Sequence, residues 1–269
     1  MTRRAELKQK ARGSLKGNYG VVVGVMLLSS LVLGVCSGIL QLVCSVVGTF
    51  STAGSIALSG AAGLGSQVSI AVVTGSVPSI VCSLLTSIIY SGLTYILMVG
   101  GIRVYLKLCA GEKAEIGDLF WGFQNDPIRF GGIGALISAV MELCLLPVVI
   151  LVVAMSVSKE SGFLLFAVLF MLVYGLVLTV VGIYLALTFG MFLYVLVDRP
   201  EMTLWQALGE SRRLMKGNRI RLVMLQISFI GWGLISILTL GIGLLWLNGY
   251  ILCTTAWFYK DLYRSLNLE

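Results

Sequence analysis

The chain has 269 residues, of which 58% are hydrophobic and only 12% are charged, with a formal net charge of +7 and a mean hydropathy of +1.00. A soluble domain carries about 25% charged residues, so this composition excludes a water-soluble globular protein and indicates an all-α protein that crosses a membrane several times. The positive charge does not indicate a nucleic-acid partner, because the bases adjoin apolar runs, where anionic lipid headgroups are the nearer counter-ions.

The basic residues are concentrated between the apolar runs. Eighteen of the nineteen Lys and Arg residues fall in four stretches, namely residues 3–16, residues 103–129, residues 199–221 and the tail with Lys260 and Arg264. Short basic loops of membrane proteins stay on the cytoplasmic side. We therefore predict that all four stretches are cytoplasmic and that the chain crosses the membrane an even number of times, with six spans.

Residues 2–18 begin the chain with a short basic helix. One helical face carries its apolar positions, which are Leu7, Ala11, Ser14 and Leu15. This pattern is typical of an amphipathic helix that lies in the membrane interface, and Gly17-Asn18 ends it. The first span is predicted at residues 21–47, a run longer than the roughly 7–15 apolar residues of a cleavable signal peptide.

Residues 48–79 carry no charge, and thirteen of these thirty-two residues are Gly or Ser. Small, weakly apolar residues suit a flexible external loop or a segment packed against the bundle. We reject a span within residues 56–74, because it would move every later basic stretch to the other side. The second span is predicted at residues 79–102, with Arg103 and Lys107 reaching the cytoplasmic headgroups.

The next part of the chain contains one loop and two long apolar runs. Aromatic residues mixed with charges at 109–130 are more often membrane-belt residues than a binding site, and a third span is predicted at 131–157, with Lys159-Glu160 as its external turn.

Residues 162–197 would form a helix about 54 Å long. Splitting this run into two spans would place the six basic residues of 199–221 on the outer side of the membrane. We therefore predict one tilted or kinked helix that bends or packs closely at Gly175, Gly182 and Gly190.

Residues 222–259 are also too long for a single span. Here the string Thr239-Leu240-Gly241-Ile242-Gly243 offers a turn near the middle of the run. A hairpin at this point returns Lys260 and Arg264 to the cytoplasmic side, so these residues are predicted to form the fifth and sixth spans.

A short string occurs twice in the chain. Arg12-x-x-x-Lys16-Gly17-Asn18 reappears as Arg212-x-x-x-Lys216-Gly217-Asn218, each time between an amphipathic helix and a span. In the second copy, residues 203–206 open the helix as a capping box. Residues 118–132 are a degenerate third copy that ends in Gly131-Gly132. The chain is thus predicted to be a single integral-membrane domain made of three units of interfacial helix plus hairpin, at about 1–108, 109–197 and 198–269.

The Lys-Gly-Asn corners have two interpretations. Glycine supplies the left-handed turn that ends a helix, and asparagine tolerates the same conformation, so the corners can serve as topological anchors at headgroup depth. Alternatively, they contact anionic lipids or a protein partner. The candidate contact residues are Arg12, Lys16, Gly17, Asn18, Arg212, Arg213, Lys216, Gly217 and Asn218.

Glu142 is the one acid deep within a predicted span. Charged residues at this depth are costly and often mark ion or proton paths. The alternative is a neutral carboxyl group that is hydrogen-bonded to a neighbouring helix, with Gln226, Gln41 or a Ser/Thr hydroxyl as its partner. Gln226 and Asn248 are two further candidate intramembrane polar residues, and they are more simply explained as interhelical hydrogen-bond partners.

Six strings towards the two ends of the chain are distinctive, namely residues 4–8, 15–19, 211–218, 227–232, 238–247 and 256–259. Together they resemble an uncharacterised bacterial family of integral-membrane proteins known as domain of unknown function 975. The chain departs from the family at Asn248-Gly249-Tyr250, where a proline is expected before the tyrosine. The resemblance implies a fold and a bacterial inner-membrane location, and it carries over no catalytic residue.

The motifs of common enzyme classes are missing from the sequence. The chain has no histidine and no CxxC pair, so neither a metal site nor a cofactor is expected, and its six cysteines are interpreted as small hydrophobic residues. We expect a non-catalytic scaffold, regulator or partner subunit that contacts anionic lipids and a membrane-protein partner or a second copy of itself. The alternative is a small transporter that uses Glu142; inverted repeats would favour it, but these repeats run in the same orientation.

Overall fold

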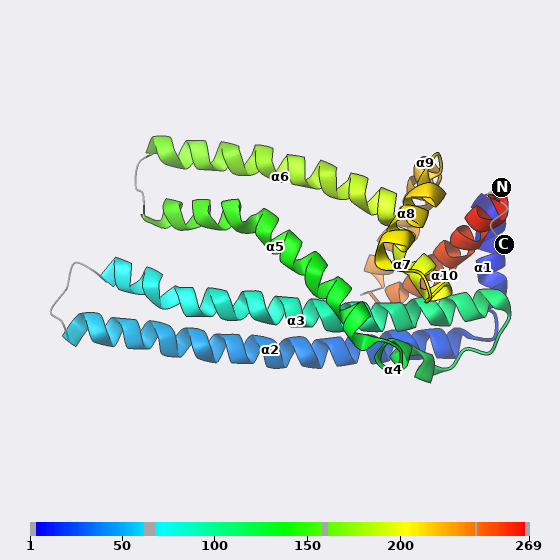
Figure 1. Ribbon diagram of the computed structural model, residues 1–269, viewed down its shortest axis with the longest axis horizontal. Helices are drawn as coiled ribbons and strands as arrows, with labels where there is room; N and C mark the ends of the chain where they lie inside the picture. Colours follow the sequence, from blue (N-terminus) through cyan, green and yellow to red (C-terminus); the bar gives the residue numbers. More distant parts are fainter. Residues whose placement is uncertain (1–3, 62–67, 158–160, 240, 267–269) are drawn as a thin grey trace. The chain divides into compact units, whose positions relative to one another are not determined.

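The structure is a computed structural model, and it describes residues 4–61, 68–157, 161–239 and 241–266. Within these ranges every regular element is helical, which confirms the predicted all-α class. The elements in chain order are α1 (Arg4–Leu15), α2 (Tyr19–Ala61), α3 (Val68–Ala110), the 3₁₀ helix η1 (Ile116–Phe120), α4 (Trp121–Gln124), α5 (Pro127–Val157), α6 (Ser161–Phe189), α7 (Phe192–Asp198), α8 (Leu204–Met215), α9 (Arg219–Leu238) and α10 (Ile242–Ser265) (Figure 1).

Five stretches of the described residues are long and apolar enough to cross a membrane. They are Tyr19–Ser51, Ile80–Ala110, Pro127–Val152, Gly162–Asp198 and Arg219–Leu238. In the most apolar part of the third stretch, no residue is buried inside the protein. In the corresponding part of the fourth stretch, only 6% of the residues are buried. Side chains this apolar and this exposed need hydrocarbon around them, because contact with water is unfavourable for such a surface.

The predicted sixth span coincides with α10, which is not among these five stretches. Its apolar run is interrupted by the polar residues Asn248, Thr254 and Thr255. The number of six spans therefore stays a prediction.

The predicted external loop at 48–79 is wrong over its described residues. α2 continues to Ala61 and α3 begins at Val68, so residues 48–61 and 68–79 are helical, while residues 62–67 lie outside the described ranges. Glycine and serine weaken a helix, but a helix that has already formed continues at little cost, because each added residue brings one more backbone hydrogen bond.

The long run at 162–197 forms one passage with a single break. α6 continues without interruption through Gly175 and Gly182 and ends at Phe189, and α7 begins at Phe192. The break therefore falls at Gly190, one of the three glycines predicted to bend the helix. A Cβ atom at Gly190 would lie 2.8 Å from the carbonyl oxygen of Ala186, so a side chain there would collide with the preceding turn.

The predicted turn between the last two long helices is confirmed. α9 ends at Leu238 and α10 begins at Ile242, with Gly241 in the left-handed region at φ +83°. The hydroxyl of Thr239 accepts a hydrogen bond from the backbone N–H of Gly243, 3.1 Å away. The two helices pack against each other, as a hairpin requires.

The degenerate third copy of the corner does not lie where the sequence predicted it. Gly131-Gly132 lies inside α5, which already begins at Pro127. The chain turns instead at Asp126, whose φ of 56° is positive. The reason is that Pro127 sets the first residue of the helix, and an aspartate tolerates the left-handed conformation directly before it.

The chain forms two compact units, each built from separate stretches. The first unit comprises Met1–Ser30, Leu97–Asp126 and Val177–Glu269, and the second unit comprises Leu31–Ile96 and Pro127–Leu176. The division of the sequence into three repeats of helix plus hairpin stays a prediction.

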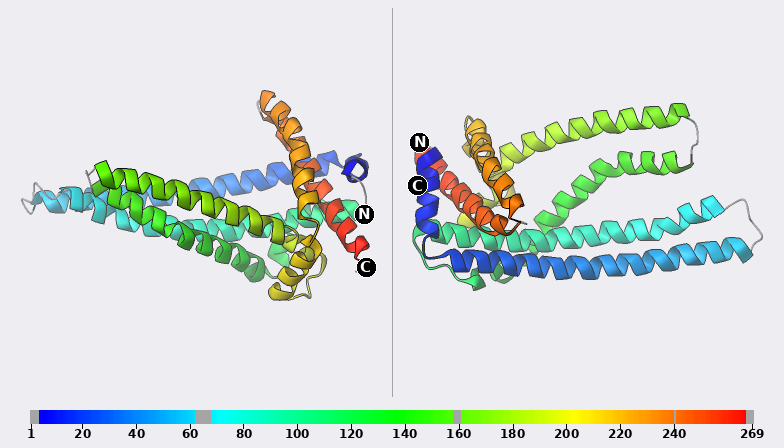
Figure 2. Two further views of the ribbon diagram at one scale, coloured as in Figure 1. Left: turned by 90° about the horizontal axis from the view of Figure 1, so that it is seen from above. Right: turned by 180° about the vertical axis from the view of Figure 1, so that it is seen from behind.

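In the first unit, α1 lies beside α10, and Figures 1 and 2 show the two helices together. The apolar face of α1 is completely covered, with at most 1% exposure for Leu7, Ala11 and Leu15. Trp257 of α10 donates its indole N–H to the Ser14 hydroxyl at 3.1 Å, and Tyr250 donates to the carbonyl of Lys8 at 3.4 Å. The apolar stripe that was predicted to face the membrane interface therefore packs on protein.

In the second unit, neighbouring helices are joined by polar and close-packed contacts. The Sγ atoms of Cys44 in α2 and Cys82 in α3 are 3.3 Å apart. The Ser91 hydroxyl of α3 donates to the carbonyl of Gly134 in α5, 2.7 Å away. A Cβ atom at Gly134 would lie 2.6 Å from the carbonyl oxygen of Ser91, so the two backbones approach closely because this residue has no side chain.

The last helix pair of the second unit is α5 and α6. The Tyr174 hydroxyl of α6 donates to the carbonyl of Cys144 in α5 at 2.6 Å. α5 is bent along its length (Figure 1), and Pro147 lies inside it. A proline leaves the carbonyl four residues earlier without its helical donor, which gives the bend a physical cause.

Candidate functional site

The two Lys-Gly-Asn corners have the same backbone turn. Gly17 has φ +90° and Gly217 has φ +80°. At the first corner, the N–H of Lys16 donates to the carbonyl of Arg12; at the second, Lys216 repeats this contact with Arg212, and both bonds measure 3.1 Å. The predicted αL turn is thus confirmed at both copies, and an L side chain at either glycine would be strained.

The asparagine of each corner repeats the same side-chain contact. The Asn18 amide donates to the carbonyl of Ser14 at 3.3 Å, and the Asn218 amide donates to the carbonyl of Leu214 at 3.2 Å. Each asparagine thus caps the end of the helix before it, and Asn218 makes no side-chain bond to the start of α9. This explains why Gly and Asn recur together, since one makes the turn and the other satisfies a helix-end carbonyl.

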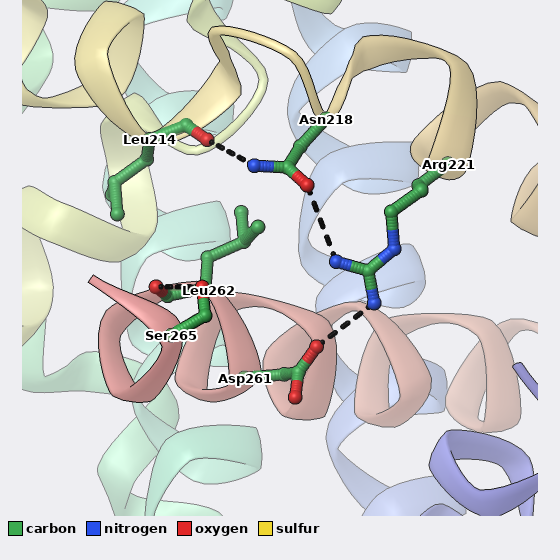
Figure 3. A network of polar contacts seen from close by, with 6 residues as sticks. All are labelled: Leu214, Asn218, Arg221, Asp261, Leu262 and Ser265. Atoms are coloured by element: carbon green, nitrogen blue, oxygen red, sulfur yellow. Dashed lines mark hydrogen bonds and ion pairs between the residues drawn. The ribbon is translucent and has the colours of Figure 1, made fainter. Parts of the chain in front are cut away.

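The second corner is tied to another helix by an ion pair. The Asn218 carbonyl oxygen accepts from Arg221 at 3.2 Å, and Arg221 forms an ion pair with Asp261 of α10 at 2.9 Å (Figure 3). The position equivalent to Arg221 in the first copy is Val21, which cannot form this pair. The second corner is therefore held in place from two sides.

α8 begins and packs as its sequence suggests. The Thr203 hydroxyl accepts from the N–H of Gln206 at 3.4 Å, and the Gln206 side chain accepts from the N–H of Thr203 at 2.9 Å, which confirms the predicted capping box. The helix packs against α7. Its buried face carries Ala207, Ser211, Leu214 and Met215.

The opposite side of α8 borders an open hollow of about 740 Å³, here called the α8–α9 hollow. It is lined by Gly209, Arg212, Arg213, Lys216, Gly217, Arg219 and Ile220. Four of the predicted contact residues, Arg212, Arg213, Lys216 and Gly217, are therefore brought together here. The hollow is the candidate functional site.

Three residues of the α8–α9 hollow were not predicted: Gly209, within α8, and the neighbouring pair Arg219 and Ile220. The guanidinium group of Arg219 lies 4.8 Å from the centre of the Tyr184 ring. Its Nε atom is buried and has no hydrogen-bond partner among the described residues. Ile220 is 73% exposed. The sequence signal for Arg219 and Ile220 was their place directly after Asn218, at the first turn of a span.

The first corner borders a smaller hollow of about 440 Å³ with a different charge. Its charged side chains are Lys16 and Glu112, and Trp257 and Ser14 also line it. Arg12 does not line this hollow; its guanidinium group lies 5.5 Å from the centre of the Tyr250 ring. The two copies thus share a backbone turn but not a cluster of cations.

The intramembrane candidates occupy two different environments. Glu142 is half-buried in the second unit, and the Ser87 hydroxyl of α3 donates to its carboxylate. A serine hydroxyl was one of the three partners considered for this acid. Gln226 of α9 and Asn248 of α10 belong to the first unit, and both are exposed on the protein surface.

Among the described residues, no group of three or more His, Cys, Asp or Glu side chains could hold a metal ion. A family model described as "Protein of unknown function (DUF975)" matches residues 1–265. No curated protein and no solved structure matches the chain.

Proposed function

This chain belongs to the DUF975 family of proteins of unknown function, and from that premise we propose that it is a non-catalytic, multi-pass protein of the bacterial cytoplasmic membrane. The five membrane-length stretches and α10 make six spans, and both chain ends are cytoplasmic. α1 and α8 lie at the cytoplasmic headgroups and contact anionic lipids. The protein serves as a scaffold, a regulator or a partner subunit of other membrane proteins, or of a second copy of itself, and it binds no nucleic acid.

The observation that supports this proposal is the orientation of the two short basic helices. α1 and α8 both bury their apolar faces on protein and expose cations, with Arg12 in the first helix and Arg212 in the second. Lys16 and Lys216, which directly follow the two helices, are exposed as well. Each helix is followed at once by a membrane-length helix. Cations next to a span are attracted by anionic headgroups by about 1 kcal/mol each.

Three acids with partners on other elements support a non-catalytic role. Asp118 pairs with Lys107, and Asp261 pairs with Arg221. Asp198 accepts a hydrogen bond from Tyr259 at 3.0 Å. Each of these carboxylates holds two elements together, and the chain has no histidine that could act with them in proton transfer.

The alternative function is a small transporter or permease with Glu142 in its path. The contact of Glu142 with Ser87 joins α5 to α3, which is what an interhelical hydrogen bond does in a bundle that does not transport. A proton path also needs further titratable groups along its length. We therefore favour the scaffold.

Two measurements on the full-length protein test the proposal. Native mass spectrometry from nanodiscs that carry native lipids is expected to show bound anionic lipids together with a stoichiometric protein partner or a second copy. In proteoliposomes with a pH gradient, the wild type and Glu142→Gln are expected to show the same leak as empty liposomes. A pH-linked flux that Glu142→Gln abolishes would establish the transporter instead.

A further inference from the structure

We propose that the α8–α9 hollow binds a phosphomonoester group, carried either by a lipid headgroup that ends in a free phosphate or by a soluble phosphorylated molecule. The inference that a lipid carries this group rests on the proposed membrane function, whereas the inference that the site binds a phosphomonoester does not. The hollow is large enough for such a group, since about 740 Å³ lies within the roughly 300–1,000 Å³ of ligand pockets.

The charge of the α8–α9 hollow favours a ligand with more than one negative charge. Its lining carries four cations, Arg212, Arg213, Lys216 and Arg219. One carboxylate, Glu210, lies 3.9 Å from Arg213 and offsets part of this charge. A phosphodiester carries a single negative charge, whereas a phosphomonoester carries about 1.5 to 2 at pH 7. The surplus of cations therefore matches the monoester better.

One residue that lines the hollow, Arg219, has a donor without a protein partner in the part of the chain that the structure describes. Arginine binds phosphate through two parallel N–H bonds, and the buried Nε of Arg219 has no partner among the described residues. Stacking on Tyr184 fixes the plane of this guanidinium group.

The start of α9 adds a second set of donors. Asn218 precedes this helix, but its side chain makes no capping bond to it and turns instead to Leu214 and Arg221. The first N–H groups of α9 are therefore left without a side-chain cap, in a place where a helix terminus attracts phosphate. The ion pair of Arg221 with Asp261 (Figure 3) holds this terminus in place.

The surroundings of the hollow suit a ligand with an apolar part. Ile220 lines the hollow and is 73% exposed, and Trp205 of α8 is 83% exposed. Trp205, Gly209, Arg212 and Lys216 follow one another at spacings of four, three and four residues, so they share one face of the helix. An exposed tryptophan beside cations is typical of a protein surface at headgroup depth, which favours the lipid source.

The first corner provides an internal comparison. Its hollow has the same backbone turn but contains one cation, Lys16, against one acid, Glu112. General attraction to anionic lipid acts on both corners, whereas phosphomonoester binding is assigned to the second alone. Variants at equivalent positions can therefore separate the two effects.

The first experiment measures binding to the full-length protein in nanodiscs, where both faces of the membrane are accessible. The probes are phosphatidic acid, a monoester lipid, and phosphatidylglycerol, a diester lipid, each in a neutral phosphatidylcholine background. Arg212→Gln with Lys216→Gln is expected to weaken phosphatidic acid binding by about tenfold or more. Arg12→Gln with Lys16→Gln removes the same charge and is expected to change it by less than about threefold.

A second pair of variants fills the hollows without changing charge. A Cβ atom at Gly209 or at Gly13 meets no atom within 4 Å, and both residues lie inside helices, so leucine at either site keeps the fold. Gly209→Leu is expected to reduce phosphatidic acid affinity by about tenfold or more, whereas Gly13→Leu, in the lining of the first hollow, leaves it unchanged. A melting temperature no lower than that of the wild type confirms that each variant is folded.

The pH and a soluble probe identify the group and its source. The second proton of a phosphomonoester leaves near pH 6, so phosphatidic acid binding should strengthen between about pH 5 and 7.5 while phosphatidylglycerol binding stays constant.

Glycerol 3-phosphate is the soluble probe. An affinity equal to that of phosphatidic acid assigns a soluble ligand to the hollow, and a weaker affinity assigns the lipid. The proposal is overturned if both lipids bind equally or if the two double variants weaken binding equally. That result would leave the membrane-scaffold proposal standing.

Discussion

At the scale of single residues, Glu142 and Ser87 connect α5 with α3 inside the second unit. Glu142→Gln keeps a hydrogen-bonding side chain of the same length. Glu142→Leu removes the interhelical bond, so that the Ser87 hydroxyl keeps its bond to the Leu84 carbonyl within α3, at 2.8 Å. Interhelical hydrogen bonds in membranes contribute about 0.6 kcal/mol on average and about 1.7 at most. We expect the leucine variant to lower the free energy of unfolding by an amount in this range, and the glutamine variant by less, in reversible unfolding in mixed micelles.

Ser83→Ala is the control for this pair, because the Ser83 hydroxyl donates within its own helix, to the carbonyl of Ile80 at 2.7 Å. It is expected to leave the stability unchanged within about 0.5 kcal/mol. Equal losses for Glu142→Gln and Glu142→Leu would mean that the negative charge, rather than the hydrogen bond, stabilises the pair.

Asp118 gives a pH-dependent prediction outside the spans. Burial raises the pKa of its carboxyl group, but the N–H of Glu115 at 3.0 Å and the ammonium of Lys107 at 2.5 Å outweigh burial, so the pKa lies below the ordinary value of 3.8. A lowered pKa means that the folded state binds the proton more weakly than the unfolded chain. The stability contributed by Asp118 is therefore fully present above about pH 4 and is lost as the pH falls through the folded-state pKa.

The measurement is the melting temperature of the wild type and of Asp118→Asn as a function of pH. The difference between them should be constant from about pH 7 to 5 and should shrink below about pH 4. A difference that persists unchanged at lower pH would mean that the asparagine is destabilising through its packing, not through the lost ion pair with Lys107.

Part of the candidate site could be predicted from single residues. The repeated string identified Arg212, Lys216 and Gly217, because a basic corner after an amphipathic helix is visible in the sequence. Asp261 could not be paired with Arg221 in the same way. The two are forty residues apart, and a single sequence contains no sign of which of several nearby bases an acid will meet in the fold.

At the scale of elements, two glycines can be compared directly, Gly217 in the turn and Gly209 in the helix before it. A Cβ atom added at either glycine would have no neighbouring atom within 4 Å, but Gly217 has φ +80° whereas Gly209 is helical. Gly217→Ala is expected to destabilise by about 1–2 kcal/mol, because an L residue is strained there. Gly209→Ala is expected to stabilise by up to about 1 kcal/mol through its helix propensity, and thermal unfolding measures both changes.

A destabilising Gly209→Ala would contradict the open space beside that residue. A neutral Gly217→Ala would contradict the left-handed turn, and with it the equivalence of the two corners. Gly217→Asn is the further control, since asparagine tolerates this conformation better than alanine.

The packing of α1 gives a second prediction at this scale. Leu15 is completely buried on the helix that lies beside α10. Leu15→Ala is expected to lower the free energy of unfolding by about 2–5 kcal/mol, because it removes buried methyl groups and leaves a cavity. Leu238→Ala, at a residue that is 84% exposed, is the control and should have a small effect. Equal effects at the two sites would mean that α1 is not packed on protein.

The errors of prediction at this scale have a common cause. The segment at 48–79 looked like a loop because of its Gly and Ser content, and the stripe of α1 looked lipid-facing because of its amphipathic pattern. Both inferences used local composition alone. The continuation of α2 and α3 decides the first, since each residue added to an existing helix gains a backbone hydrogen bond, and the presence of α10 decides the second.

At the scale of the whole molecule, the prediction concerns the sides of the membrane. All six native cysteines are buried or half-buried, so single added cysteines can be labelled with a membrane-impermeant maleimide. Thr239→Cys, in the exposed turn between α9 and α10, is expected to react in intact cells. Lys216→Cys, at the second corner, is expected to react only after the cells are permeabilised, because basic loops stay inside.

Labelling of Lys216→Cys in intact cells would overturn the cytoplasmic location of the corner and the count of six spans together. The wild-type protein is the control for background reaction at the native cysteines. Labelling of Thr239→Cys only after permeabilisation would mean that α9 and α10 do not form a transmembrane hairpin.

The class of the whole molecule could be predicted, whereas its assembly could not. Composition and the spacing of the bases suffice for a multi-pass helical protein, because hydrocarbon restricts the structures that can cross it. The two compact units are each made of two or three separate stretches. Which distant stretches associate depends on side-chain fit, as at Gly134 and Ser91, and a pattern of hydrophobic residues along one sequence contains no information on that fit.

The contact between α1 and α10 also constrains the order of events during biosynthesis. Cys253 donates to the carbonyl of Ala11, a residue 242 positions earlier in the chain. The ribosome finishes the first helix long before it makes the last, so the leucines of α1 have no docking surface until translation is nearly complete. A chaperone or the lipid surface must shield them in the meantime, and a chain truncated before α10 would expose them permanently to the proteases that remove incomplete membrane proteins.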